Sequence, residues 1–282
     1  MAHPIGTIIH PTDFSNASIE AFAHAMAFSL VARSRLHILH IAGEGEDYSR
    51  YTFPQVYRLL GHWGKIGPKE TPQEIEARTG VRVSKIALAP GNIRQRIEDF
   101  IASHGCDLMI LSTHHRDAWR RLISSSVATG AADDSRVPTL FLRDDVTGFI
   151  DPETGACRLK TVLVPIGSEV SDEAVRRIEE ITSLVAPKVR FKMLHIGTKQ
   201  PVVIYTEGYQ RVLPIELRPG GVVETIARSA SEMGAGLIAM PTEGRHGLSD
   251  ALFGTTTERV LYEASCPVLA VPMFQDRSVV RP

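Results

Sequence analysis

The sequence predicts an α/β protein with two tandem domains, each built on a parallel sheet, and three observations support this prediction. The second half of the chain repeats the first, apolar runs alternate with helical patterns in both halves, and those runs are apolar without interruption. Strands that alternate with helices indicate βαβ units and a parallel sheet. Continuously apolar strands indicate a sheet covered on both faces. A length of 282 residues suits two domains of about 100–150 residues each.

The repeat is visible in the residue numbers. From residue 89 onward, positions match those 129 residues later, so that 107–111 (DLMIL) falls over 236–240 (GLIAM) and 136–140 (RVPTL) over 265–269 (SCPVL). Earlier in the chain, 8–11 (IIHP) matches 162–165 (VLVP) and 39–41 (LHI) matches 194–196 (LHI), at offsets of 154 and 155. The second copy therefore lacks about 26 residues between its second and third strands. Repeats of this length indicate tandem domains and not a solenoid.

The elements of the first copy can be justified in chain order. Gly6–His10 is a β-branched run that ends at Pro11, and apolar residues at helical spacing follow over Ser15–Leu30, with Ser15 as the expected N-cap. The same alternation predicts later strands at Leu36–Ile41, Val81–Leu88, Leu108–Ser112 and Thr139–Arg143. It predicts helices at Ile93–Ser103 and between the fourth and fifth strands, as far as about Asp134.

The extra segment of the first copy, Asp47–Gly80, is expected to hold helices at Pro54–Leu60 and Pro72–Thr79. Much of the aromatic content of the chain lies in it, at Tyr48, Tyr51, Phe53, Tyr57 and Trp63. Aromatic side chains are favoured at interfaces, which predicts a cover near a ligand cleft or a partner contact. The equally supported alternative is that these rings cap their own domain.

These patterns give the domain organisation. We assign residues 1–143 to a first domain, 144–159 to a linker rich in glycine, proline and charge, and 160–274 to a second domain. The remaining residues, 275–282, form a polar C-terminal tail.

Composition excludes several classes of function. With 31 basic and 32 acidic residues, there is no electrostatic case for binding nucleic acid or an anionic membrane. No apolar run approaches the roughly 20 residues of a membrane helix, and the N-terminus does not have the layout of a signal peptide. Three cysteines without a CxxC pair are typical of reduced thiols, so we expect a cytoplasmic protein. Cys106 and Cys266 are expected to be small buried apolar residues.

One segment of the second copy has the pattern of a phosphate-binding loop. Gly244 and Gly254 are separated by nine residues, and Thr255 and Glu258 form a capping-box pattern that predicts the start of a helix. Free N–H groups at a helix start bind anions, and a glycine lets the backbone approach them closely. In parallel α/β sheets, ligands bind beyond the carboxyl ends of the strands, which is where this loop lies.

Here the chain resembles the universal stress protein family over nearly all of both copies. The family motif is Gly, two residues, Gly, nine residues, then Gly-Ser or Gly-Thr; in this chain Pro241 replaces the first glycine, and Gly244, Gly254 and Thr255 retain the rest. The segment 266–271 (CPVLAV) fits the family's fifth strand. The resemblance implies two Rossmann-like domains of the adenine nucleotide alpha hydrolase type, each with five parallel strands in the order 3-2-1-4-5. It also implies that ATP phosphates and ribose lie on the glycine loop, while an Asp after the first strand and a backbone group after the second contact adenine.

Carried over to this sequence, the resemblance gives two sets of candidate nucleotide-binding residues. Those of the second domain are Pro165, Ile196, Met240, Thr242, Gly244, Arg245, Gly254, Thr255, Thr256 and Thr257. The weaker set, in the first domain, is Pro11, Asp13, Ile41, Ser125 and Ser126.

Each copy departs from the family pattern in a different place. The first keeps the adenine-side acid as Asp13, but its glycine loop is replaced by Ser112, His115 and Ser125. Where the loop is lost, such an Asp is more often a helix cap or turn residue than a ligand contact. The second keeps the glycines but has Gly167 where the acid belongs. Phosphates depend on several loop contacts whereas the acid supplies one, so we expect at most one nucleotide per chain, in the second domain.

Other polar groups have ordinary explanations. His114, His115 and Asp117 are expected to form an exposed loop and not a metal site, since adjacent histidines diverge. Arginines 116, 120 and 121 around Trp119 are typical of a solvated helix face. His40 and His195 share one repeat position at a strand end and are expected to be packed or hydrogen-bonded. The pattern contains no arrangement of catalytic side chains.

The leading hypothesis is therefore a non-enzymatic stress-response module that binds ATP or another adenine nucleotide, with or without Mg²⁺. The alternatives are a nucleotide-free scaffold of the same fold and, ranked last, a weak ATPase. The two domains are expected to pack as an internal pseudo-dimer through Thr139–Arg143 and Val268–Pro272, because open apolar edges would aggregate. A homodimer and an unidentified protein partner are further expectations.

Overall fold

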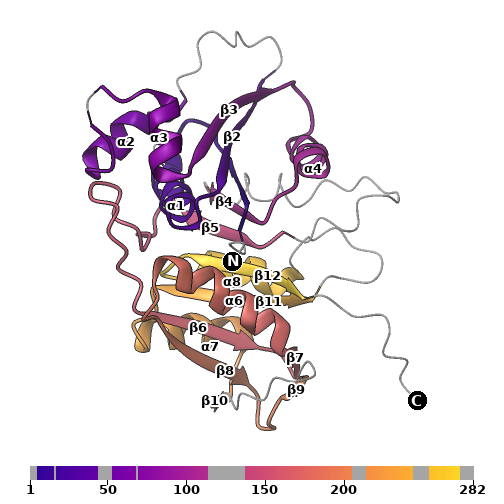
Figure 1. Ribbon diagram of the computed structural model, residues 1–282. Coiled ribbons are helices and arrows are strands. Elements are labelled where there is room, and N and C mark those ends of the chain that lie inside the picture. The colour runs from indigo at the N-terminus through magenta and orange to yellow at the C-terminus, as the bar shows by residue number, and fades with distance from the viewer. Residues whose placement is uncertain are drawn as a thin grey trace.

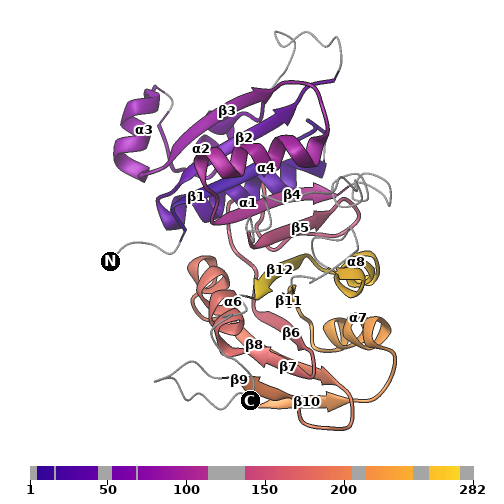
Figure 2. The same ribbon diagram turned by 90° about the vertical axis from the view of Figure 1, so that its right-hand side faces the viewer.

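One continuous ten-stranded sheet runs through the computed structural model, which describes residues 5–15, 17–43, 53–67, 69–113, 137–204, 214–243 and 254–273. The strands of the two halves follow one another across the molecule in the order β10-β8-β6-β11-β12-β5-β4-β1-β2-β3 (Figures 1 and 2). Each half contributes five of them, so the two copies seen in the sequence are joined edge to edge.

The first domain holds five parallel strands in the order β3-β2-β1-β4-β5. They are β1 (Thr7–Pro11), β2 (Arg35–Ile41), β3 (Arg82–Leu88), β4 (Leu108–Thr113) and β5 (Thr139–Arg143). The helices are α1 (Ala17–Ala32), α2 (Val56–His62), α3 (Pro72–Thr79) and α4 (Ile93–His104). The helix expected between β4 and β5 lies outside the described residues.

The second domain repeats this order as β10-β8-β6-β11-β12, so the predicted 3-2-1-4-5 arrangement is confirmed in both copies. Its strands are β6 (Thr161–Ile166), β8 (Arg190–Ile196), β10 (Ile215–Arg218), β11 (Leu237–Glu243) and β12 (Val268–Met273). The helices are α6 (Asp172–Val185), α7 (Val222–Glu232) and α8 (Gly254–Glu263). The pattern did not predict the separate parallel sheet of β7 (Glu169–Ser171) and β9 (Val202–Ile204).

The seam between the domains is an antiparallel contact of the two fifth strands, as expected for an internal pseudo-dimer. Three pairs set its register: Val268 with Phe141, Leu269 with Leu140, and Ala270 with Thr139. Leu140 and Leu269 are equivalent in the repeat and face each other, and the other two pairs exchange under the same equivalence. A surface that meets its own equivalent is isologous, so a local twofold axis passes between Leu140 and Leu269.

Helices cover both faces of the sheet. Helices α1 and α6 lie on one face, contact each other across the seam, and share one apolar core with α2 and α3 (Figure 1). Helices α4, α7 and α8 pack on the other face. Because α1 meets the sheet, α6 and the linker, every residue from 21 to 28 is buried. No helix in the described ranges is long and apolar enough to cross a membrane.

The linker is held to the first domain by hydrogen bonds to its backbone. Glu20 accepts from Gly148 N at 2.7 Å, and His24 Nε2 accepts from Phe149 N at 3.0 Å and Ile150 N at 3.1 Å. Trp63 Nε1 donates to the carbonyl oxygen of Pro152 at 2.9 Å. The segment between the domains is therefore an ordered part of the first core.

The extra segment of the first domain forms the two predicted helices, although α2 begins two residues later than expected. Thr71 and Glu74 form a capping box at the start of α3. Trp63 is buried and Phe53 partly buried against their own domain, which agrees with the capping interpretation, whereas Tyr57 is exposed. Tyr48 and Tyr51 lie outside the described residues.

Candidate functional site

A cleft of about 620 Å³ opens in the second domain, where β6, β8 and β11 end. Of the residues that the structure describes, sixteen line it: Pro165, Ile166, Gly167, Ser168, Glu169, Val170, His195, Ile196, Val222, Ile226, Met240, Pro241, Thr242, Thr256, Thr257 and Met273. Parallel strands end at a common edge of the sheet, and this edge is where such folds bind ligands. The volume falls in the ordinary range for small-molecule sites.

The cleft combines an apolar floor with a few hydroxyl groups. Met240 and Ile226 are buried beneath it, as are Thr242 and Thr257, which expose 4% and 3% of their surface. Thr257 belongs to the first turn of α8, where backbone N–H groups have no partner within the helix. This end of the cleft therefore offers hydroxyl and amide donors to an anion, while the floor suits a flat apolar ring.

Six of the ten residues predicted for this site line the cleft, namely Pro165, Ile196, Met240, Thr242, Thr256 and Thr257. Gly254 and Thr255 form the first positions of α8. The helix thus begins one residue before the N-cap that the capping-box pattern predicted, a difference within the usual fraying of helix ends. Gly244 and Arg245 lie outside the described residues.

The lining residues that sequence reasoning missed include two groups. The first group is Ser168, Glu169 and Val170, which line the cleft because the chain after β6 forms β7 and pairs with β9. A strand of three residues is too short to show an apolar pattern in the sequence. Val222 and Ile226 line the cleft from the start of α7. The repeat could have found these two, since they follow the Pro-Gly turn that both copies carry at equivalent positions.

A pair of equivalent hydrogen bonds ties the first and second strands together in both domains. His195 Nδ1 donates to the carbonyl oxygen of Ile166 at 3.0 Å, and His40 Nδ1 donates to that of Thr12 at 2.9 Å. The expectation that these histidines are hydrogen-bonded is confirmed. Each fixes the end of a strand, and His195 also forms part of the cleft wall.

In the first domain, Asp13 serves the start of α1. Its Oδ1 accepts from Ser15 N at 3.0 Å and from Ser18 Oγ at 2.8 Å, and Ser18 Oγ lies 3.1 Å from Ser112 Oγ. These contacts agree with the helix-capping interpretation of Asp13. Pro11 and Ile41 end β1 and β2, while Ser125 and Ser126 lie outside the described residues.

Burial shifts the pKa of two cysteines and two histidines toward their neutral forms. Burial raises the pKa of the Cys106 and Cys266 thiols to about 12, which removes them as thiolate nucleophiles. Burial also lowers the pKa of His10 and His24 to about 4. Among the described residues, no three His, Cys, Asp or Glu side chains gather as a metal site would require.

The sequence model of the universal stress protein family matches residues 4–143 and 198–272 of the chain. The chain belongs to the universal stress protein family. No curated protein sequence matches it.

Solved structures of universal stress proteins have the same two-domain fold. A universal stress protein from Archaeoglobus fulgidus is 16% identical with a TM-score of 0.58, and the match covers 96% of this chain and 99% of that one. A candidate universal stress protein from Pseudomonas aeruginosa is 17% identical with a TM-score of 0.59, covering 95% and 93%. Identities this low establish the fold alone.

Proposed function

We propose that this universal stress protein is a non-enzymatic regulatory module that binds one adenine nucleotide per chain, in the cleft of the second domain. The observation that carries the proposal is the convergence on one cleft of six residues chosen from sequence alone. The base would lie toward Pro165 and Ile196, at the ends of β6 and β8, and the phosphates toward the first turn of α8.

The residues present fit an adenine nucleotide. Thr256 and Thr257 bring hydroxyl groups to the cleft, and Gly254 places the start of α8 beside it without a Cβ atom. Bound Mg²⁺ would partly neutralise the negative charge of the phosphates. This chain's own residues orient the ligand, and neither a general base nor a redox group is assigned to them.

One observation favours the nucleotide-free scaffold as the second candidate. Gly167 stands where the family's acid contacts adenine. The wall beside it carries Glu169, whose negative charge has the same sign as that of a nucleotide's phosphates. Losing one hydrogen bond to the base costs about 0.5–1.5 kcal/mol, or up to about tenfold in affinity. A loss of this size weakens a site without abolishing it, so the binding function ranks first.

The deciding experiment is to denature the purified protein and analyse the supernatant for adenine nucleotides, followed by calorimetry of stripped protein with ATP. We expect a stoichiometry of one. Two ATP per chain would contradict the assignment to a single domain, and none would favour the scaffold. Accumulation of ADP over time would point to the weak ATPase.

The setting of this function is also part of the proposal. We place the protein in the cytoplasm, which agrees with three free cysteines. Ligand binding in the cleft would alter a surface that a protein partner recognises. A homodimer would have to form through surfaces other than the seam, because β5 and β12 already pair with each other.

A further inference from the structure

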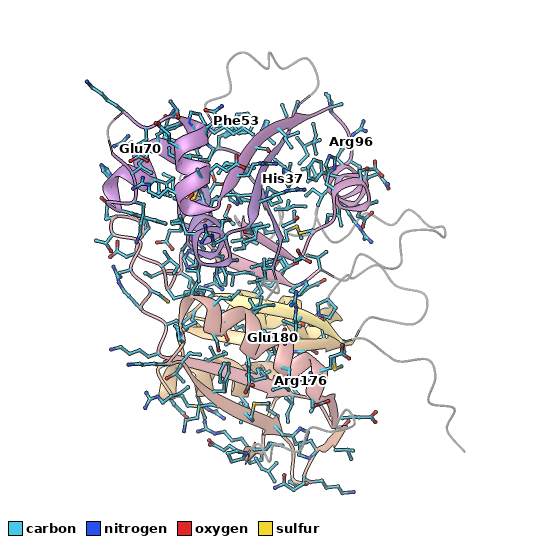
Figure 3. All side chains as sticks on the ribbon, viewed as in Figure 1. His37, Phe53, Glu70, Arg96, Arg176 and Glu180 are labelled. Atoms are coloured by element: carbon cyan, nitrogen blue, oxygen red, sulfur yellow. The ribbon has the colours of Figure 1, made fainter. Side chains whose placement is uncertain are left out.

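An aromatic cluster lies at the end of β1 and β2 in the first domain. The ring of Phe14 lies on the ring of His40, with centroids 4.2 Å apart and planes inclined by 31°. Phe53, labelled in Figure 3, meets Phe14 edge-on at 5.2 Å and 80°. Offset and edge-to-face contacts of this kind are favourable between rings.

The repeat shows what this place corresponds to in the second domain. His40 is equivalent to His195, and both donate the same hydrogen bond to the end of the first strand. Phe14 is equivalent to Ser168. Both His195 and Ser168 line the open cleft of the second domain, and the Phe14 ring lies on His40, so the aromatic cluster stands at the part of the first domain that corresponds to this cleft wall.

The backbone of Phe14 supports a specific role for its ring. Phe14 has a φ of 62°, in the left-handed region that residues with a side chain rarely adopt. Such a conformation persists only where the surroundings enforce it, and it often marks a functional position. Phe53 supplies part of those surroundings, and it comes from the extra segment that the second copy lacks.

We propose that Phe14, backed by Phe53, fills the base end of the first domain's cleft, so that this domain carries a closed site for a flat heterocycle of the adenine class. The proposal rests on the function proposed for the second cleft. It goes further by giving a cause for the asymmetry: the first site is occupied by the chain itself, in addition to lacking the glycine loop.

The test is to replace Phe14 by glycine, which removes the ring and accepts the observed φ without strain. The probe is adenosine, which presents the base without phosphates, and the number of sites per chain is measured by calorimetry. We expect Phe14→Gly to gain one site relative to the unmodified protein. Photolabelling with 8-azidoadenosine should mark the first domain in the variant but not in the unmodified protein. Tyr57→Ala, which removes an exposed ring of the same extra segment, should gain none.

A second variant, Phe14→Gly/Phe53→Ala, prevents Phe53 from moving into the vacated space and should also gain one site. A gain from none to one would support the closed site and show that the second domain does not hold adenosine without its phosphates. An unchanged count of one in both folded variants would overturn the closed site and leave the proposed function standing. No adenosine binding in any of them would overturn the closed site, and the ATP stoichiometry of the unmodified protein would decide the proposed function separately.

Discussion

At the residue scale, the position with the greatest expected effect on ligand binding is Gly254. It is the first residue of α8, at the proposed phosphate end of the cleft, and a side chain there would hinder the close approach of a phosphate to the backbone. We expect Gly254→Val to lower ATP affinity on the order of 100-fold, because several charge-assisted contacts are lost together.

The control is Asp13→Ala, since the Asp13 carboxylate is engaged by Ser15 and Ser18. It should leave ATP affinity unchanged and cost about 1 kcal/mol of stability, as loss of a helix-start acceptor does. Calorimetry and urea unfolding measure the two effects. Normal ATP binding by Gly254→Val would refute the assignment of the phosphate end.

Two buried histidines should make the protein sensitive to mild acid. His10 and His24 have a folded pKa of about 4 against an ordinary value of 6.5. Between these values the unfolded chain binds protons that the folded chain does not. The stabilisation that depends on the neutral histidines is therefore fully present above pH 6.5 and is lost as the pH falls from there through 4. Each histidine can account for up to about 3 kcal/mol.

His24 has a geometric reason for this behaviour, because its Nε2 accepts two linker N–H groups and cannot do so when protonated. Urea midpoints measured from pH 7 to pH 4 should decline, and His24→Gln should make the decline shallower. The exposed His62, replaced by Gln, serves as the control. An identical pH profile in His24→Gln would contradict the role given to this residue.

At the element scale, the contact between the extra segment and the linker should be measurable. Gly155 has a φ of 70°, and a Cβ atom there would lie 2.6 Å from the Trp63 ring. Gly155→Ala should therefore lower the free energy of unfolding by about 1–3 kcal/mol, in addition to the cost of placing an alanine in the left-handed region. Gly234→Ala is the matched control, with a φ of 59° and no atom within 4 Å of the added Cβ. Equal changes in unfolding free energy would show that the Trp63 contact contributes nothing.

The elements also show what sequence could and could not predict. Strand order and most strand bounds followed from apolar runs and the family resemblance, because burial on both faces leaves a strong compositional pattern. Three residues of β7 leave no such pattern, so the Glu169 wall of the cleft was missed. The role of Phe53 was hidden as well, because its contact with Phe14 spans 39 positions and depends on how the extra segment folds back.

At the scale of the whole molecule, the continuous sheet should make the two domains unfold together. The seam buries Leu140 and Leu269 to 1% exposure, and α1 contacts α6 across it. Both tryptophans, Trp63 and Trp119, belong to the first half, so their fluorescence reports that half while circular dichroism reports both. We expect the two urea transitions to coincide. A Leu269→Ala variant should weaken the seam, and separated transitions in the unmodified protein would refute the coupling.

The isologous seam has a consequence for how the two domains came to differ. A self-complementary edge is what a single-domain ancestor would use to pair with a second molecule, at a strength set by its concentration. Once both edges belong to one chain, the short tether holds them at an effective concentration in the millimolar range or above, so pairing no longer depends on protein abundance. A substitution in one domain then no longer appears in the other, as it would in both subunits of a homodimer. Drift can proceed separately on the two sides of Leu140 and Leu269, which leaves one half free to lose a ligand that the other retains.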